Sequence, residues 1–364
     1  MTRHTTRTLP MLLACLCGLA AAGELNAKQK KLMAELRDCP FRIVFESHRD
    51  GNWDLYLMNA DGSGLRNLTR TPDVQEMYPH ASPDGTRLLF VAEQTKGGKR
   101  THESYLMNLD GTGRRQIAKN ARQPFWGPKG KRIGYVKAEK GSFSEAGRHN
   151  RGLYYLDLAT GEQTRHPRND VFNLLNPCWS SDGRWICATI LGGMGFRDSI
   201  VVFEAHGTKV FELVRSHKPA KNVYQCRPDL SPDGRHVGWG KDDVDNHFGT
   251  GRRTMWVEVG DIDLTAPEIK LTNRRNVVTV KYPLETYHIE WSPDSRFIAY
   301  SQGERGKGRM GGSRPVIGRK APGWDLWVVK PSEPEVAVQL TFDGQSNKEP
   351  DWVPAARPAS KAGQ

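Results

Sequence analysis

The chain of 364 residues is poor in cysteine and has no long apolar run after its first 22 residues. Without a run of about 18 apolar residues, the body of the chain is not expected to span a membrane. The four cysteines beyond the leader do not make a disulfide framework, and no pair of them has the close spacing of a zinc site. With 37 glycines and 22 prolines the chain is rich in turns, but it is neither collagen-like nor of low complexity.

Acidic residues are outnumbered by basic ones. Lysine and arginine total 53 against 41 aspartates and glutamates, which leaves a net charge of +12. Such a balance favours anionic partners, namely nucleic acid, an anionic glycan or a membrane surface.

The N-terminus has the pattern of a signal peptide. Arg3 and Arg7 precede an apolar stretch over residues 9–22 that ends in small residues, and cleavage after Ala22 or Ala27 fits this pattern. We expect a periplasmic or secreted protein, which argues against nucleic acid as the partner. Cys15 leaves lipid anchoring open as an alternative, and a short buried helix is a further reading of the stretch.

Cys178 and Cys187 flank the turn Ser180–Gly183. Pairing across an Asp-Gly loop places the two cysteines opposite each other, which permits a cross-hairpin disulfide. Two free buried thiols are the alternative interpretation.

One phrase recurs along the chain at intervals of about 45 to 61 residues. Each copy reads as a short strand, a Pro-Asp-Gly type of turn and a strand of alternating apolar residues. The copies begin at Tyr78, Gln123, Asn176, Arg227 and His288, with a truncated copy at Glu349.

Two further strands follow in each unit, joined by hairpins such as Asn59–Gly64 and Asn108–Gly113. The Asn-x-Asp-Gly-x-Gly sequence suggests a calcium loop, but it lacks the longer ligand series and the closing glutamate of an EF-hand. We therefore interpret these segments as turns.

Four antiparallel strands repeated about six times predict an all-β, six-bladed β-propeller. The first unit begins at its second strand, residues 41–45, and the last copy supplies only an inner strand, residues 349–353. The C-terminal strand should therefore pair with the N-terminal one and close the ring, which leaves no free edge. The predicted organisation is a signal peptide over 1–22, a linker over 23–38, one propeller over 39–354 and a disordered tail over 355–364.

The repeat resembles that of TolB-type propellers. The Ser-Pro-Asp-Gly turn, the Met-Asn-x-Asp-Gly hairpin and Leu-Thr at 68–69, 271–272 and 340–341 carry this resemblance over residues 41–354. It implies the propeller fold and one of several uses: protein binding in the periplasm, substrate gating on peptidases, or oligogalacturonate lyase activity. TolB itself has a domain before its propeller, and only residues 23–38 are available for one here, so a Tol-Pal role is not expected.

In a propeller the starts of the inner strands surround the channel mouth. The residues directly before each proline position should ring that mouth, with Arg122, Cys226, Tyr287 and Lys348 one residue further out. We predict a ligand site formed by Tyr78, Arg122, Gln123, Asn176, Arg227, His288, Lys348 and Glu349.

The ligand predicted for this mouth is anionic, with Arg227, Lys348, Arg122 and His288 at its centre. Long loops rich in glycine and basic residues, at 137–152, 242–253 and 303–323, should lie on the same face and give it a positive field. Simple solvation of the polar residues, or pairing of Arg227 with Glu349, is the alternative.

A catalytic role has less support. Lyases of this fold hold a metal through His and Gln, and the ring offers only Gln123 and His288, with His80 adjacent, so we predict no metal or other cofactor. Asp229 and Glu290 are candidates for an acid/base pair, but their separation is not fixed by the sequence.

Three functions therefore remain. The first is a non-catalytic, monomeric binding module for an envelope protein or an anionic polysaccharide. The second is a carbohydrate-active lyase or hydrolase. The third is a structural envelope component whose basic charge is incidental.

Overall fold

The computed structural model describes residues 24–96, 99–138, 152–215, 217–218, 223–244, 253–304, 320 and 322–355. The predicted signal peptide, most of the three long basic loops and all but the first residue of the predicted tail lie outside these ranges.

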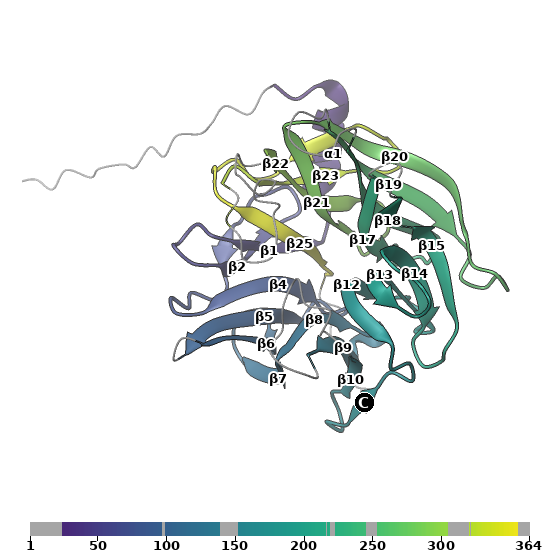
Figure 1. Cartoon of the computed structure of the whole chain (residues 1–364). Helices are drawn as coiled ribbons and strands as arrows, with labels where there is room; N and C mark the ends of the chain where they lie inside the picture. The colour runs from purple at the N-terminus through teal and green to yellow at the C-terminus, as the bar shows by residue number, and fades with distance from the viewer. Residues whose placement is uncertain are drawn as a thin grey trace, which may run out of the picture.

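Six antiparallel sheets stand side by side around an axis as blades 1 to 6 of a β-propeller (Figure 1). Each blade has four strands, and blade 5 carries one additional short strand, β16 (His217–Lys218), at its inner edge. This confirms the predicted fold class. The innermost strands of blades 1 to 6 are β25 (Asn347–Val353), β4 (Gln75–Ala81), β8 (Ala121–Trp126), β12 (Val171–Trp179), β17 (Val223–Leu230) and β21 (Leu284–Trp291).

The remaining strands follow outward in each blade. The second strands are β1 (Arg42–Ser47), β5 (Arg87–Lys96), β9 (Arg132–Lys137), β13 (Trp185–Gly193), β18 (His236–Val244) and β22 (Ile298–Glu304). The third strands are β2 (Asp54–Asn59), β6 (Lys99–Asn108), β10 (Leu153–Asp157), β14 (Ser199–Glu204), β19 (Arg253–Ile262) and β23 (Asp325–Val329). The outer strands are β3 (Arg66–Asn67), β7 (Arg115–Lys119), β11 (Gln163–Arg165), β15 (Val210–Arg215), β20 (Leu271–Lys281) and β24 (Ala337–Gln339).

The two ends of the propeller chain meet in blade 1. Strand β25 pairs antiparallel with β1 from Arg42–Val353 to Ser47–Asn347. The ring is therefore closed by main-chain hydrogen bonds as the split first repeat predicts, and β1 has no free edge.

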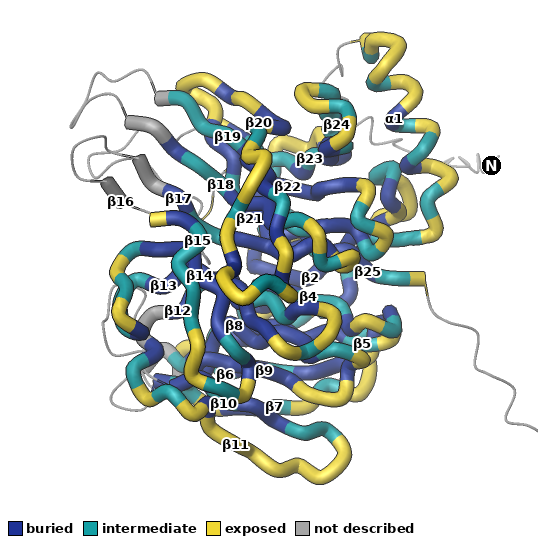
Figure 2. Tube along the Cα trace, turned by 90° about the vertical axis from the view of Figure 1, so that its right-hand side faces the viewer, coloured by how far each residue is buried: buried dark blue, intermediate teal, exposed yellow. Residues whose placement is uncertain are grey.

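The turns that follow the inner strands share one hydrogen-bond pattern. The Ser82 hydroxyl accepts the amide of Arg87 at 2.9 Å, and Ser292 accepts the amide of Phe297 at the same distance. In the second set of hairpins, the Asp61 and Asp110 carboxylates accept amides of their own turns. These carboxylates serve the turns, which supports the turn interpretation over a calcium loop. The turns and the exposed helix surface account for much of the yellow tube in Figure 2, whereas the strands between them are mostly buried.

Neighbouring blades are joined through tryptophans at the ends of the inner strands. The Trp126 indole donates to the His80 carbonyl at 2.9 Å, and the Trp352 indole donates to the Glu290 carbonyl at 3.1 Å. Each bond links one inner strand to that of the preceding blade, which fixes the relative position of the two strands at the axis.

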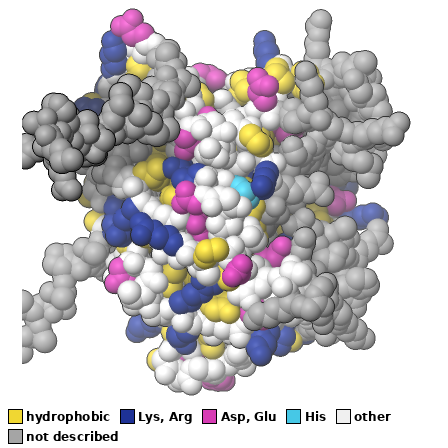
Figure 3. Space-filling model, turned by 90° about the vertical axis from the view of Figure 1, so that its left-hand side faces the viewer, with side chains coloured by type: hydrophobic (Ala, Val, Ile, Leu, Met, Phe, Trp, Pro, Cys, Tyr) yellow, Lys and Arg dark blue, Asp and Glu magenta, His cyan; other side chains and the backbone are white. Residues whose placement is uncertain are grey.

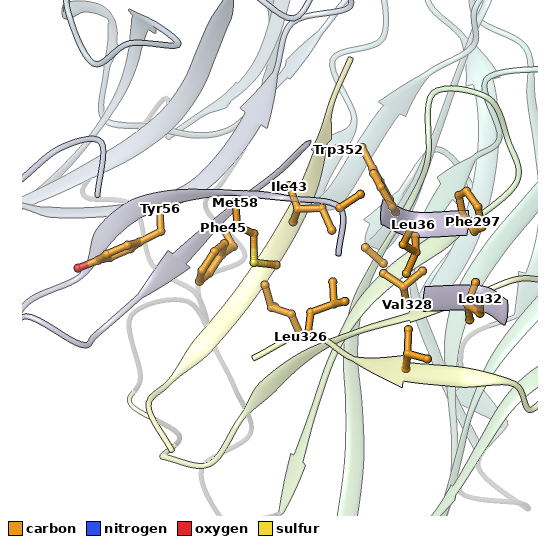
Figure 4. Close-up of a cluster of buried hydrophobic side chains, with 14 residues drawn as sticks. Leu32, Leu36, Ile43, Phe45, Tyr56, Met58, Phe297, Leu326, Val328 and Trp352 are labelled. Atoms are coloured by element: carbon orange, nitrogen blue, oxygen red, sulfur yellow. The ribbon is translucent and has the colours of Figure 1, made fainter. Parts of the chain in front are cut away.

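A helix lies in the segment that the sequence assigned to a linker. Helix α1 (Ala27–Arg37) begins with a capping box in which Asn26 and Gln29 exchange side-chain to backbone hydrogen bonds. Its Leu32 and Leu36 pack against residues of blades 6 and 1, including Trp352 (Figure 4). The helix therefore covers the seam where the ring closes. No helix within the described ranges is both long and apolar enough to cross a membrane.

The closure makes a first prediction. Deletion of residues 347–364 removes β25 and should expose the edge of β1, causing aggregation or loss of a cooperative thermal transition. Deletion of residues 356–364 alone keeps β25 and serves as the control, which should melt like the full chain. If the longer deletion also melts like the full chain, the closure does not stabilise the fold.

Helix α1 makes a second prediction. Leu36 is 1% exposed, so Leu36→Ala should lower the free energy of unfolding by about 2–4 kcal/mol through lost burial and a cavity. Lys28→Ala, on the exposed side of the same helix, should change it by less than about 0.5 kcal/mol. Chemical denaturation measures both. Equal stability of the two variants would show that the helix is not part of the folded unit.

Candidate functional site

Each inner strand contains an irregularity at its repeat position, where its pairing with the second strand shifts register. The residue there has a left-handed backbone, with φ between 47° and 61°. Non-glycine residues adopt this conformation rarely, and a bulge of this kind turns side chains in a new direction. We call these six the ring residues: Tyr78, Gln123, Asn176, Arg227, His288 and Glu349.

The side chains of the ring residues contact one another. The Tyr78 hydroxyl donates to Gln123 Oε1 at 2.9 Å, and Arg227 Nη1 donates to Asn176 Oδ1 at 2.9 Å. Asn176 Nδ2 lies 2.9 Å from His288 Nδ1, although the two residues belong to blades 4 and 6. The structure thus brings the predicted ring together, but as a buried network, since only Arg227 among the six is more than 9% exposed.

The charges of this network balance one another. Glu349 lies 2.7 Å from His288 Nδ1 and 3.7 Å from Arg227 Nη1. Burial alone raises the pKa of Glu349, but the positive charges of His288, Arg227 and Lys348 outweigh it and bring that pKa down to about 2. The predicted pairing of Arg227 with Glu349 is therefore present, and it lies in the interior.

The other two predicted cations are also beside carboxylates. Lys348 is fully buried, with its ammonium 3.4 Å from Glu46 Oε1 and 4.4 Å from the ring of Trp53. The Arg122 guanidinium lies 3.5 Å from Glu93 and is 4% exposed. An anion entering here would have to displace a protein carboxylate at each of these positions.

The outer surface on the side seen in Figure 3 does not supply the positive charge that is neutralised at the channel mouth. There, the coloured side chains of Lys and Arg are interspersed with those of Asp and Glu over the described residues. Opposite charges side by side produce a weaker field than a patch of one sign, so the described residues on this side form no concentrated positive surface.

A cavity of about 150 Å³ lies next to the ring, toward the C-terminal ends of the inner strands, and we call it the axial pocket. Its walls include the residue two positions after the ring residue in every one of the six blades. Asn176 of the ring also lines it, as do Trp126 and Trp179. The six equivalent residues are His80, Phe125, Cys178, Asp229, Glu290 and Asp351.

The axial pocket has two unlike sides. Blades 5, 6 and 1 contribute the carboxyl groups of Asp229, Glu290 and Asp351, whereas blades 3 and 4 contribute aromatic rings. Phe125 and Trp179 lie with ring centroids 5.6 Å apart. Carboxylates facing the rings of tryptophans form a suitable environment for a positively charged group.

Two of these carboxylates also join blades. Asp351 accepts the amide of Ala81 at 2.8 Å, and Asp229 accepts the amide of Trp291 at 2.8 Å. Each bond leads to the inner strand of the next blade. One oxygen of each carboxylate therefore has a structural role. Histidine rings also lie beside two of the three carboxyl groups, His288 at 3.0 Å from Glu290 and His80 at 3.5 Å from Asp351, so only the remaining acceptor capacity is available to a ligand.

Asp229 and Glu290 are strongly coupled. Burial raises the pKa of Asp229 to about 6, and burial together with Asp229 and Asp351 raises the pKa of Glu290 well above its usual range. A hydrogen bond joins the two carboxyl groups, so they act as a pair that shares one proton. The predicted acid/base candidates are thus adjacent, and raised pKa values of this kind are common at functional sites.

Other expected features can be compared with the structure. Cys178 and Cys187 face each other in the strand register as predicted, and both are free thiols. Among the described residues, no three His, Cys, Asp or Glu side chains are placed to hold a metal ion.

Apart from Asn176, the site predicted from the sequence did not include the lining of the axial pocket. The sequence pointed to His80 only beside possible metal ligands and to Asp229 and Glu290 only as an acid/base pair. Strand alternation turns direct neighbours to opposite faces but leaves residues two positions apart on the same face, so the residue two positions after each ring residue is a candidate to reach the axis as well. Their equal offset within every repeat was the signal that could have identified the pocket.

The axial pocket makes a stability prediction. Because folding raises the pKa of Asp229 above its unfolded value of 3.8, ionisation of this carboxyl destabilises the fold progressively between about pH 4 and pH 6 and fully above. Asp229→Asn keeps an oxygen for the Trp291 amide and removes the charge. It should raise the melting temperature by a few degrees at pH 7.5 and leave it nearly unchanged at pH 4. A variant that is less stable at pH 7.5 would contradict the assignment.

Comparisons with known proteins place the chain by its fold only. No protein-family model matches the sequence, and no curated protein matches it. Among solved structures, it is similar to the hydrazine synthase of Kuenenia stuttgartiensis, with TM-score 0.52, 14% identity, and coverage of 86% of this chain and 46% of that one. It is also similar to an oligogalacturonate lyase in complex with manganese, with TM-score 0.48, 15% identity, and coverage of 84% of this chain and 74% of that one. A protein of Agrobacterium tumefaciens assigned as TolB is similar with TM-score 0.39, 19% identity, and coverage of 66% of this chain and 88% of that one. The strand topology makes the protein a six-bladed propeller, and at these identities the similarity to solved structures concerns the fold alone.

Proposed function

We propose that the protein is an exported, non-catalytic binding module whose axial pocket receives one basic side chain of an envelope protein. The observation that carries the proposal is the composition of the pocket. Three carboxyl groups from adjacent blades face aromatic rings from two others, in a cavity formed by the same position of all six repeats.

The chemistry of the pocket favours a guanidinium or ammonium group. Charged hydrogen bonds to carboxylates and the faces of tryptophan rings both stabilise such a cation. The pocket also contains a destabilising carboxyl pair that shares one proton. A bound cation stabilises the fully ionised pair, so the shared proton leaves when the cation binds. A volume of about 150 Å³ suits a side-chain head group better than a sugar chain, because sites for whole small molecules span roughly 300–1,000 Å³.

The anionic glycan predicted from the sequence is the competing proposal. The net charge of +12 supports it, but the contacts of Arg227, Lys348 and Arg122 with carboxylates count against these residues as its site. The carbohydrate-active alternative rests on Asp229 and Glu290, whose raised pKa values suit a general acid.

The test uses two blocked amino acids of nearly equal shape and different charge, Nα-acetyl-arginine amide and Nα-acetyl-citrulline amide, titrated calorimetrically at pH 8. We expect only the arginine compound to bind, and to bind more weakly at pH 5, where the carboxyl pair is protonated. Glu290→Gln and Asp351→Asn should each weaken binding about tenfold, the effect of losing one charged contact of about 1.4 kcal/mol.

Glu268→Gln is the matched control, because this glutamate is an exposed acid of blade 5 with a side chain 69% exposed and outside the pocket. Equal binding of arginine and citrulline compounds would contradict the proposal, as would variants that bind like the wild type. Acidic oligosaccharides form the second arm. If these oligosaccharides bind and Arg227→Gln weakens that binding, the glycan proposal is favoured. If the protein cleaves them, the enzyme alternative is favoured.

A further inference from the structure

A larger cavity of about 540 Å³ lies between blades 4 and 5, apart from the axial pocket, and we call it the interblade groove. Three segments form it, all on the side of the propeller where the turns that follow the inner strands lie. They are the turn before β13 at 183–185, the β14–β15 hairpin and the β19–β20 connection at 264–267. Its size is within the range of sites that accept a small molecule or a few residues of a peptide.

The floor of the interblade groove is apolar and held in place. The rings of Trp185 and Phe211 lie 5.9 Å apart at 60°, next to Leu264. The Trp185 indole donates to the Leu264 carbonyl at 3.1 Å, which joins the two blades and fixes the plane of the ring. A floor of this kind offers a rigid surface to another flat apolar group.

The rim of the groove carries two exposed basic residues, Arg184 and Lys209. The Arg184 guanidinium lies 2.6 Å from Asp182, so it is already paired with a carboxylate. The one carboxylate in the lining, Glu204, accepts the amides of Thr208 and Lys209 at 3.0 Å, so it is engaged within its own hairpin. Within the described ranges, no acidic side chain pairs with the Lys209 ammonium. The groove therefore combines an apolar floor with one exposed ammonium group at its rim, that of Lys209.

The groove and the axial pocket share a wall. Trp179 lines the axial pocket, and its ring centroid lies 6.0 Å from that of His206, which lines the groove. The Trp179 indole donates to the carbonyl of Gly183, another groove residue, at 3.0 Å. The two cavities are therefore neighbours, linked through the contacts of Trp179 with His206 and Gly183.

We propose that the axial pocket and the interblade groove form one peptide-binding surface, in which the groove takes an aromatic residue next to an acidic one from the segment whose basic side chain fills the axial pocket. This inference rests on the proposed function and adds the partner's chemistry. The aromatic ring stacks on the floor of Trp185 and Phe211, and the neighbouring carboxylate pairs with the Lys209 ammonium on the rim.

The test measures the two halves of such a segment separately and joined. The probes are acetyl-Arg amide, acetyl-Trp-Glu amide and peptides that link them through glycine-serine spacers of increasing length. Lys209→Gln removes the rim charge, and Ala266→Phe fills the groove without changing charge. Lys270→Gln, an exposed lysine of blade 5 outside the groove, is the control.

We expect acetyl-Trp-Glu amide to bind about two- to fivefold more weakly to Lys209→Gln, the effect of one exposed ion pair, and still more weakly to Ala266→Phe. Glu290→Gln should leave this half unaffected, and Lys270→Gln should change nothing. A linked peptide of suitable spacer length should bind at least tenfold more tightly than either half.

The outcomes separate the two proposals. If acetyl-Trp-Glu amide binds wild type and both groove variants equally, or fails to bind at all, the inference is overturned even where the arginine probe binds. If only acetyl-Trp-Glu amide binds, with loss in both groove variants, the groove is a site but the proposed function fails. Linked peptides that bind no more tightly than the better half would contradict a single surface.

Discussion

Six inner strands run to one axis, so the side chains at each level of the channel must share a space too narrow for six independent groups. At the ring level this constraint is met by mutual neutralisation, because Glu349 contacts both His288 and Arg227. At the next level Asp229, Glu290 and Asp351 lie close together, with the His288 ring 3.0 Å from Glu290 and the His80 ring 3.5 Å from Asp351. Burial there raises the pKa of both Asp229 and Glu290. Buried charge of one sign destabilises a fold, and it persists where a ligand supplies the missing charge.

The repeat was enough to predict the blades and the closure of the ring. Its period separates the units, its turn residues mark the hairpins, and the missing inner strand of the first unit appears at Glu349. These features depend on local backbone chemistry, which a sequence displays directly. The pairing of β25 with β1 follows from them, because a closed ring is the arrangement that leaves no edge of the sheet unpaired.

The side-chain arrangement at the axis could not be predicted in the same way. The left-handed backbone of Tyr78 and its five equivalents requires a bulge, and the bulge decides which residues face the axis. Ion pairs such as Lys348 with Glu46 join segments 302 positions apart, and no local pattern announces them. Helix α1 is different, since Asn26 and Gln29 form a recognisable cap and Leu32 and Leu36 are one turn apart.

The net charge of the chain favours an anionic partner, whereas the axial pocket favours a cationic group. The two preferences are compatible because they act over different distances from the protein. A chain of charge +12 repels a cation in bulk solution and attracts an anion, whereas within a few ångströms the three carboxyl groups of the axial pocket dominate. A partner segment that is acidic overall but carries one basic residue satisfies both conditions. The proposed partner of the interblade groove meets the same two conditions, because the exposed ammonium of Lys209 lies in the lining with Trp185 and Phe211 and suits an acidic residue next to an aromatic one. On the proposed function, the long-range field would attract such a segment to the protein and the axial pocket would set its register.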